Sequence, residues 1–407
     1  MSKWEWKKLG EVCDVIAGQS PQSSAYNSEG LGLEFHQGKK AFGKRVIQPS
    51  NVWTKEYSKI AKKGDILMSV RAPVGPVNFT DREICIGRGL AAIRKTGALD
   101  ENFLFYYFIN NESNMTSKAG AVFDSINRSD IQKFIIPVPP LSEQKRIVKF
   151  LDEEFSKIET LKTNAETNLK NAKELFETTL EKELNPQSRH SERSEESSAD
   201  LPSGWEWKTL QEICGKIVDG THNSPPNKAK GDYQYITAKN IKADGIDLSD
   251  VTYVSKEVHK EIFARCNPEK GDVLLIKDGA TTGIAVINTL DYEFSLLSSV
   301  ALIKVDKTKI YEKTLVYLLN SKAIYKQMRK KMDGAAITRL TLEKIKALQI
   351  PLPPLSVQKE IVARLDKLSE NVKRLEANYK QIIANCDELK KSILKKTFEG
   401  DSRSSRE

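Results

Sequence analysis

Two groups of polar side chains are candidates for specific contacts, because each lies among glycines or prolines. In the first half of the chain they are Gln19, Ser20, Gln37, Lys39, Lys40, Arg71 and Arg88, and in the second half Thr221, His222, Asn223, Lys239, Asn240, Lys277 and Arg339. Side chains of these types hydrogen-bond to base edges and phosphates, and glycine lets a backbone approach closely. Taken singly, each is better explained as a solvated loop residue. Their recurrence in both halves favours a nucleic-acid contact surface.

Residues for catalysis are hard to find in this chain. Gly38-Lys39-Lys40 is not a phosphate-binding loop, because it lacks the upstream glycine and the following Ser or Thr. Ser224-Pro225-Pro226-Asn227 comes nearest to an amino-methylase signature, but it lacks the aromatic residue that would stack on an extruded base. The 4 histidines are dispersed and the 5 cysteines form no CxxC pair, so no metal site or disulfide framework is indicated. We therefore expect a binding protein without catalytic residues, metal or cofactor of its own.

Length and charge agree with this expectation. A chain of 407 residues is too long for one ordinary core and suits two domains with connecting elements. A net charge of +9 favours a polyanionic partner without requiring one. The sequence has no signal peptide and no apolar run near the roughly 20 residues that a membrane-spanning helix needs. We expect a cytoplasmic protein.

An internal repeat organises the elements that must position these side chains. Residues 136–152, IPVPPLSEQKRIVKFLD, recur 214 positions later at residues 350–366, IPLPPLSVQKEIVARLD. The prolines end an extended run, and Ser142 and Ser356 follow where a helix N-cap is expected. Lys145 and Lys359 replace the Glu or Gln of an ideal capping box. Each copy therefore predicts a strand followed by a long helix.

Three further matches extend the repeat in the same order along both halves. Residues 4–13 match 205–214, residues 63–67 match 270–274, and residues 83–94 match 293–304. The offsets change slightly between matches, as expected when loops differ in length. We interpret the chain as two copies of one module.

Each module combines short strands with helices. Residues 65–70 and 272–276 are apolar runs that follow Gly-Asp turns, and residues 101–110 and 311–320 have helical patterns. The predicted class is α+β. The expected domains are residues 1–140 and 204–354, with long helices at residues 141–184 and 355–400 and a polar, Ser-rich linker at residues 185–203.

The long helices have the clearest periodicity. Apolar residues in steps of three and four predict a heptad seam at Leu365, Leu368, Val372, Leu375, Ile382 and Leu389, and a weaker seam at Leu151, Ile158 and Leu161. We predict that the second helix folds back along the first within one chain, so that the two halves are related by a pseudo-two-fold axis. The alternative is that each helix pairs in trans with another chain.

On these residues the chain resembles the specificity subunit of Type I restriction–modification enzymes. The resemblance is carried by the Trp-x-Trp-Lys-x-Leu openings, the paired PxPPLSxQKxIV junctions and the long helix after each. The stretches GQSPQSSAYNSEGLGLEFHQGKKAFG and DGTHNSPPNKAKGDYQYITAKNIKADGIDL also resemble target-recognition domains of that family. The resemblance to this family covers nearly the whole chain.

The resemblance implies two target-recognition domains, each reading one half of a split, asymmetric DNA sequence. It implies that the antiparallel coiled-coil helices fix the gap and dock two methyltransferase subunits. Those subunits would bring S-adenosylmethionine and methylate adenine after base flipping, and separate restriction subunits would cleave the DNA. The specificity subunit itself has no catalytic role in this scheme.

Three alternatives remain open on the sequence. One is a coiled-coil scaffold that joins proteins without touching DNA. Another is the recognition subunit of a different methylation-based defence system. A self-sufficient enzyme is disfavoured, because no Gly-rich cofactor loop follows a strand.

Overall fold

The structure is a computed structural model that describes residues 4–57, 59–118, 121–122, 125–185, 201–330 and 339–403. The chain divides into two compact units: unit 1 comprises Met1–Glu166 and Lys380–Glu407, and unit 2 comprises Thr167–Tyr379. Each unit combines mostly antiparallel sheets with helices, which confirms the predicted α+β class. Most of the predicted linker, residues 186–200, lies outside the described residues.

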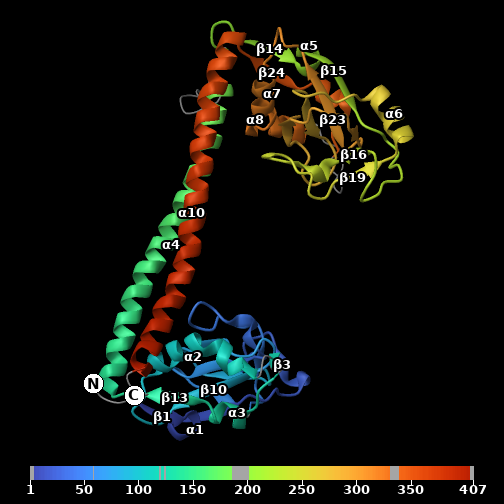
Figure 1. Cartoon of the computed structure of the whole chain (residues 1–407). Helices are drawn as coiled ribbons and strands as arrows, with labels where there is room; N and C mark the ends of the chain where they lie inside the picture. Colours follow the sequence, from blue (N-terminus) through green and yellow to red (C-terminus); the bar gives the residue numbers. More distant parts are fainter. Residues whose placement is uncertain are drawn as a thin grey trace. The chain divides into compact units, whose positions relative to one another are not determined.

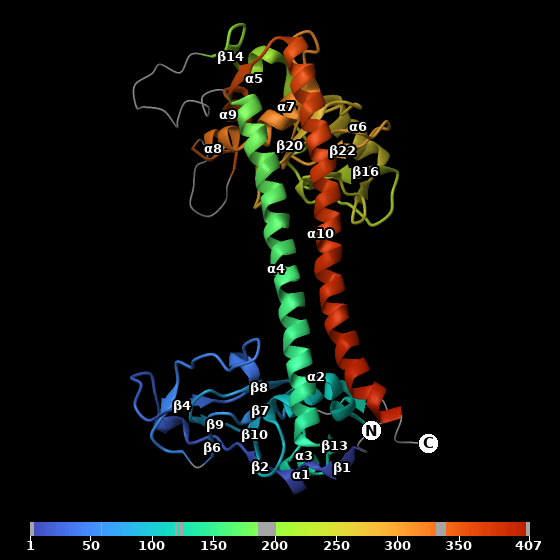
Figure 2. The same ribbon diagram turned by 90° about the vertical axis from the view of Figure 1, so that its left-hand side faces the viewer.

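Unit 1 is built on a four-stranded antiparallel sheet in the order β2-β10-β7-β8. Side chains alternate across it: Ile66 and Met68 join a core under helix α2, whereas Leu67 faces a second sheet. In Figure 2, α2 and strands β4, β6 and β9 of the second sheet lie on opposite sides of β7 and β10. The bounds are β2 Cys13–Ala17, β10 Leu90–Lys95, β7 Ile66–Ser69, β8 Val77–Phe79 and α2 Glu101–Thr116.

The second sheet of unit 1 has the order β3-β5-β4-β9-β6. Its central strands β4 and β9 run parallel and are almost fully buried. The bounds are η1 Ser23–Ala25, β3 Tyr26–Asn27, β4 Leu33–His36, η2 Lys39–Ala41, β5 Trp53–Thr54, β6 Ile60–Ala61 and β9 Ile84–Ile86. The short hairpin β11 Ser117–Lys118 and β12 Ala121–Val122 follows α2.

Unit 2 repeats the four-stranded sheet in the order β15-β23-β20-β21, again antiparallel, which confirms the predicted repeat. Helices α7 and α8 lie on one side of it, and α6 with the three-stranded sheet β19-β16-β22 lies on the other (Figure 1). The sheet strands are β15 Cys214–Asp219, β20 Val273–Ile276, β21 Ala285–Ile287 and β23 Val300–Val305. The other elements are β16 Tyr233–Ile236, η4 Ala238–Asn240, β17 Ile241–Lys242, β18 Gly245–Ile246, β19 Thr252–Val254, α6 Lys256–Arg265, β22 Ser295–Leu296, α7 Glu312–Leu319 and α8 Lys322–Lys330.

A two-stranded ladder joins the start of each module to its end. Trp6 pairs with Pro137 in unit 1, and Trp207 pairs with Pro351 in unit 2, each in an antiparallel ladder. The repeated opening and the repeated proline junction are therefore neighbours in space. The bounds are β1 Glu5–Lys8, α1 Leu9–Val12, α3 Arg128–Gln132 and β13 Ile135–Val138 in unit 1, and β14 Glu206–Thr209, α5 Leu210–Ile213, α9 Leu342–Lys346 and β24 Gln349–Leu352 in unit 2.

The two long helices begin directly after the prolines. Helix α4 spans Leu141–Leu184 and α10 spans Leu355–Arg403. The prediction of Ser142 and Ser356 as N-caps is wrong, because Pro140 and Pro354 accept the first helical hydrogen bonds, from the Gln144 and Gln358 amides at 3.1 and 2.9 Å. The serines lie inside the first turn. Within the described part of the chain, no helix is long and apolar enough to cross a membrane.

The long helices run antiparallel within each unit. In unit 1, Glu159 and Lys162 of α4 pair with Lys390 and Asp387 of α10, each at 2.7 Å, so residue numbers rise along one helix as they fall along the other. In unit 2, Glu183 of α4 likewise pairs with Arg364 of α10 at 2.8 Å. The prediction that the second helix folds back along the first within one chain is confirmed.

The end of each long helix completes a core. Leu180 and Leu184 of α4 are buried in the core of unit 2, and Leu394 and Phe398 of α10 are buried in the core of unit 1. These pairs are 214 positions apart, like the junctions, so the repeat continues to the helix ends. The Phe398 ring centroid lies 5.5 Å from that of Phe103 in α2.

The heptad positions are only partly buried. Leu151, Ile158, Leu365 and Val372 are buried, and Leu368 and Ile382 are partly buried. Contrary to the seam prediction, Leu161, Leu375 and Leu389 remain 50%, 38% and 47% exposed. A straight α-helix drifts about 20° per heptad away from a 3.5-residue repeat, which carries some predicted seam positions off the contact line.

Candidate nucleic-acid interface

Identical buried glutamines fix the junction in both units. Gln144 is fully buried, its Oε1 accepts from the Asp100 amide at 2.7 Å, and its Nε2 donates to the Ala98 and Pro139 carbonyls at 3.2 and 2.7 Å. Gln358 repeats all three bonds with matching backbone groups of unit 2 at 2.9, 3.0 and 2.9 Å. A glutamine at the same place in both repeated motifs was a signal for this role that the sequence analysis missed.

A second repeated contact joins helix α2 to α4 in unit 1 and helix α7 to α10 in unit 2. The Tyr106 hydroxyl donates to Asp152 of α4 at 2.5 Å, and the Tyr317 hydroxyl donates to Asp366 of α10 at 2.7 Å. Burial, together with the carboxylate, raises the pKa of Tyr106 to about 12 and raises the pKa of Tyr317 as well. Both tyrosines therefore remain protonated donors over the whole physiological pH range.

A buried aspartate braces the central strands of each sheet. Asp65 accepts two hydrogen bonds from Arg94 at 2.9 and 2.7 Å, and Asp272 accepts one from Lys304 at 2.8 Å. Both pairs link the strand that follows the Gly-Asp turn to its neighbour. The frame that carries the loops is thus nearly the same in the two units.

In unit 1 the structure brings four predicted contact residues together. The Gln19 amide donates to the Ile86 carbonyl at 2.9 Å, the Ser20 hydroxyl donates to Gln37 Oε1 at 2.7 Å, and the Arg88 amide donates to the Ser20 oxygen at 3.2 Å. The segment that follows β2 crosses the segment that follows β9 so closely that a Cβ on Gly18 would lie 2.2 Å from the Gly87 oxygen. We call this place the crossing. Gln19, Gln37 and Arg88 have exposed side chains.

A buried charged group supports the strand from which Gln37 emerges. Arg82 Nη2 donates to Glu34 Oε2 at 2.6 Å, and His36 Nε2 lies 3.1 Å from the same oxygen. Burial raises the pKa of Glu34, but hydrogen bonds from Arg82 and His36 outweigh it and the net shift is downward. Burial lowers the pKa of His36. The neighbouring Lys40 is exposed and Lys39 is partly buried.

Unit 2 has the same crossing with different side chains. The Thr221 amide donates to the Leu296 carbonyl at 2.9 Å, in the place of Gln19 and Ile86. A Cβ on Gly220 would lie 1.8 Å from that carbonyl oxygen, so only glycine fits. His222 and Asn223 follow with exposed side chains. One backbone arrangement therefore presents different polar groups in the two units.

A cluster of charged residues lies beneath the unit 2 crossing. Asp219 and Lys277 are both 2% exposed at the side chain, with Lys277 Nζ 3.4 Å from Asp219 Oδ2 and 3.3 Å from Asp278 Oδ2. Arg265 Nη2 donates to Asp219 Oδ1 at 2.6 Å. Arg339 Nε lies 3.4 Å from Asp278 Oδ1. The cluster therefore joins β15, the end of α6, the end of β20 and the segment before α9.

Two predicted contact residues of unit 2 are buried. Lys277 is buried between two carboxylates. Asn240 is 2% exposed, and its side chain accepts from the Thr237 amide at 3.1 Å and donates to the Asp247 carbonyl at 3.1 Å. Their burial places these two side chains under the surface instead of on it. Lys239 is exposed and pairs with Asp250 at 3.0 Å.

The arginines at residues 71 and 339 occupy one equivalent site. Arg71 forms an isolated backbone bridge with Ser125, and Asp278 forms the matching bridge with Arg339. The arginine comes from one strand of the bridge in unit 1 and from the other strand in unit 2. Arg71 is exposed, and the Arg339 side chain is 57% exposed.

Arg265 is a candidate contact residue that the sequence analysis missed. It is the last residue of α6, and its side chain is 51% exposed. The contact residues predicted from the sequence lie in polar loops, whereas this arginine belongs to a helix. Only the packing of α6 against the three-stranded sheet β19-β16-β22 brings it to the crossing.

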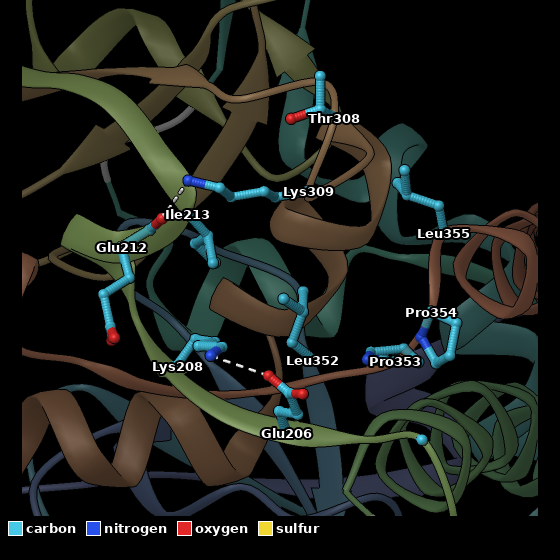
Figure 3. Close-up of a pocket in the computed structure, with 11 residues that line it drawn as sticks. Glu206, Lys208, Glu212, Ile213, Thr308, Lys309, Leu352, Pro353, Pro354 and Leu355 are labelled. Carbon is cyan, nitrogen blue, oxygen red and sulfur yellow. Dashed lines mark hydrogen bonds and ion pairs between the residues drawn. The ribbon is translucent and has the colours of Figure 1, made fainter.

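A pocket lies elsewhere in unit 2, where the β14–β24 ladder meets the start of α10. It has a volume of about 630 Å³ and is lined by Leu352, Pro353 and Pro354 among others (Figure 3). Its lysines already have partners: Lys208 pairs with Glu206 at 2.8 Å, and Lys309 donates to a backbone carbonyl at 3.1 Å. None of the predicted contact residues lines this pocket.

Comparison with known proteins gives two matches to one family. Residues 1–171 and residues 202–384 both match the family model for the Type I restriction modification DNA specificity domain. The putative type I restriction enzyme MjaX specificity subunit of Methanocaldococcus jannaschii is 44% identical over 153 residues, which cover 36% of this chain and 36% of that protein. The MjaIX specificity subunit of the same organism is 23% identical over 415 residues, which cover 98% of this chain and 94% of that protein.

Solved structures share the fold along the whole length. A chain solved in work on complex assembly and conformational transition of the type I R-M system has a TM-score of 0.74 at 21% identity, covering 98% of this chain and 99% of that one. The crystal structure of the HsdS subunit from Thermoanaerobacter tengcongensis has a TM-score of 0.60 at 20% identity, covering 98% of both chains. At these identities the similarity establishes the fold.

Proposed function

Because the chain belongs to the family of Type I restriction–modification DNA specificity subunits, we propose that it reads a bipartite, asymmetric DNA site. Each unit contacts one half of the site. The observation that carries this proposal is the crossing shared by the two units, which presents Gln19 and Ser20 in unit 1 and Thr221 and His222 in unit 2. Equivalent backbones with different donors suit two half-sites of different sequence.

The proposed contact surface of each unit consists of exposed or partly exposed polar residues around the crossing. Phosphate contacts set the register, and base contacts give the sequence preference. In unit 1 these residues are Gln19, Ser20, Gln37, Lys39, Lys40, Arg71 and Arg88, and in unit 2 they are Thr221, His222, Asn223, Lys239 and Arg339. Residues 1–140 and 204–354 form the two target-recognition domains in this proposal.

The long helices, residues 141–184 and 355–400, serve in this proposal as spacer and docking surface for two methyltransferase subunits. Their exposed leucines, Leu161, Leu375 and Leu389, support an interaction role, because large apolar side chains on a rigid helix gain free energy when a partner covers them. The methyltransferase subunits would supply S-adenosylmethionine and the catalytic residues. Restriction subunits would join the full complex.

Selection of binding sequences by the assembled complex tests the proposal. The full chain is purified with its methyltransferase subunits and offered a library of random duplexes at fixed salt. We expect two short specified segments that differ from each other and are separated by a gap of constant length. Inserting or deleting one base pair in the gap should abolish the preference.

Equal affinity for every sequence would refute the proposal. Binding that is also unaffected by Arg71→Ala and Arg339→Ala would favour the coiled-coil scaffold that does not touch DNA. If the complex selects a bipartite site and methylates it, but adding the restriction subunits produces no cleavage, a methylation-based defence system of another kind is favoured.

A further inference from the structure

The guanidinium of Arg265 is held at the surface of unit 2 by a carboxylate beneath it. Asp219 is 2% exposed at the side chain, and Arg265, whose side chain is 51% exposed, donates to its Oδ1 from Nη2 at 2.6 Å. Among the described residues, Nε and Nη1 of Arg265 have no hydrogen-bond partner. The carboxylate therefore fixes the orientation of the guanidinium and leaves N–H groups available for another acceptor.

His222 lies beside this arginine and contacts Nη2, the same nitrogen that donates to Asp219. Arg265 Nη2 is 3.1 Å from His222 Nε2. The same Nε2 lies 3.4 Å from Asp219 Oδ1. The His222 side chain is 48% exposed, so part of the imidazole is open to an outside partner. Arg265 and His222 together form one pair of positioned polar groups.

Lys277 supports the carboxylate from below. Its Nζ lies 3.4 Å from Asp219 Oδ2 and 3.3 Å from Asp278 Oδ2. Buried charges are costly unless they are closely paired, so this arrangement needs a reason to exist. Three cations, Lys277, Arg265 and Arg339, against two carboxylates leave one net positive charge at this surface.

Unit 1 shows that the fold does not require this cluster. Ala17 precedes the glycine of its crossing where unit 2 has Asp219, and Val70 takes the place of Lys277. Unit 1 also has no helix equivalent to α6 among its described residues. The same sheet and the same crossing form without any of these buried charges. The cluster is therefore an addition to unit 2 that serves its surface.

We propose that Arg265 is a DNA contact of unit 2 and that Asp219 is its positioning residue. Arg265 and His222 then act together on the half-site that unit 2 reads. This inference rests on the proposed function and adds a contact that lies outside the loops. The remaining Nε and Nη1 N–H groups can donate to a base-edge acceptor, such as O6 or N7 of guanine, or to phosphate oxygens.

Fluorescence anisotropy of the assembled complex tests this inference with its selected duplex. Arg265→Ala is compared with Lys256→Ala, which removes the same charge from the other end of the same helix and has an exposed side chain. Binding is measured at several salt concentrations and with each base of the unit 2 half-site replaced in turn. Thermal unfolding of every variant reports on folding.

Arg265→Ala should weaken binding by about tenfold, or about 1.4 kcal/mol, as expected for the loss of a charged hydrogen-bond donor, and Lys256→Ala by less than about twofold. A base contact relaxes the preference at one position of the unit 2 half-site. A phosphate contact instead lowers the salt slope by about one. Arg265→Lys retains the charge but not the planar fork, so it should recover the salt slope without recovering base discrimination.

Asp219→Asn tests positioning. It leaves Arg265 in place but removes the charge that fixes it, so base discrimination in the unit 2 half-site should fall more than total affinity. Unchanged affinity, salt slope and base preference in Arg265→Ala would overturn the inference. So would a loss of affinity that accompanies a lower Tm without a change in slope or preference. If the unmodified complex has no sequence preference, the proposed function itself fails.

Discussion

Gln19 and Ser20 follow β2 of the four-stranded sheet in unit 1, and Thr221 and His222 follow the equivalent strand β15 in unit 2. At the junction with each long helix, the buried contacts are nearly the same in both units. Gln144 and Gln358 make equivalent sets of three hydrogen bonds. The frame is therefore nearly the same in the two units while the exposed residues differ, so that one module supports two different contact surfaces.

The units also stabilise their surfaces differently. Unit 1 places a buried carboxylate, Glu34, under the strand that leads to Gln37, with Arg82 as its main partner. Unit 2 places Asp219 directly under the crossing, with Arg265 as a partner that is half exposed. The same three kinds of side chain (a carboxylate, an arginine and a histidine) serve internal support in unit 1 and the outer surface in unit 2. Position, and not residue type, separates these roles.

The largest effect should come from breaking the shared frame. Gln144→Leu and Gln358→Leu each leave one backbone amide and two carbonyls without a partner in the interior. Each such group costs about 1–3 kcal/mol, so each variant should lose at least about 2 kcal/mol of unfolding free energy. Urea denaturation of the full chain measures this loss.

The control for this pair is Gln381→Leu on the exposed face of α10, which should change stability by less than about 0.5 kcal/mol. If the two junctions are copies of one frame, Gln144→Leu and Gln358→Leu should lose similar amounts of unfolding free energy. If one variant is destabilised and the other is as stable as the control, the two junctions are not energetically equivalent and the idea of a copied frame fails.

A smaller effect is expected from the arginines at the equivalent bridge. Arg71 has no carboxylate within ion-pairing distance among the described residues, whereas Arg339 lies 3.4 Å from Asp278. Arg339 must leave this carboxylate before it binds DNA. A surface ion pair is worth about 0.2–1 kcal/mol, so Arg71→Ala should weaken DNA binding by about tenfold and Arg339→Ala by only about threefold.

Asp278→Asn tests the same competition in the opposite direction. It removes the carboxylate that competes for Arg339, so DNA binding should tighten by about two- to threefold, and Arg339→Ala in this background should then cost as much as Arg71→Ala. Anisotropy titrations at fixed salt measure the DNA affinity of these two single arginine variants, of Asp278→Asn, of the double variant and of the unmodified complex. Equal losses for Arg71→Ala and Arg339→Ala in the unmodified chain would contradict a screening role for Asp278.

Patterns in the sequence were sufficient to predict the frame of each unit, which is the junction and its long helix. The repeated junction predicted the start of both long helices, because a helix start depends on residues close in sequence. The apolar periodicity gave each helix a face that needs a partner, and the connection between the two helices favoured pairing within one chain. The N-cap prediction for Ser142 was wrong by two residues, because the Pro140 carbonyl accepts the first helical bond. Residue type alone does not distinguish these neighbouring positions.

The candidate interface was less predictable, because it depends on which distant segments meet. Lys277 and Arg71 lie at adjacent places on equivalent strands, yet the lysine is buried between two carboxylates and the arginine is exposed. Arg265 reaches the crossing only through the packing of α6. Neither burial nor this packing is encoded in the polar composition of a loop. The exposed Leu161, Leu375 and Leu389 likewise depend on how two helices turn about each other.

The smallest predicted effect concerns Glu159, which joins the two long helices within unit 1. It accepts from Lys390 at 2.7 Å and from Lys44 at 2.6 Å, and these two hydrogen bonds lower its pKa from 4.5 to about 2. A carboxylate whose pKa is lowered by folding contributes stability above its unfolded pKa and loses it as the pH falls. The contribution should therefore be complete above about pH 5 and disappear as the pH approaches 2.

Glu159→Gln removes this contribution at every pH. Its side chain is 39% exposed, so solvent screening limits the loss to about 0.2–1 kcal/mol at pH 7. The difference in Tm between the unmodified chain and Glu159→Gln should shrink steadily between pH 5 and pH 2. Glu153→Gln on the same helix, whose carboxylate lies 3.9 Å from Lys149, should show almost no difference at any pH. A Glu159→Gln effect that persists at pH 2 would mean that packing, and not charge, joins the helices at this position.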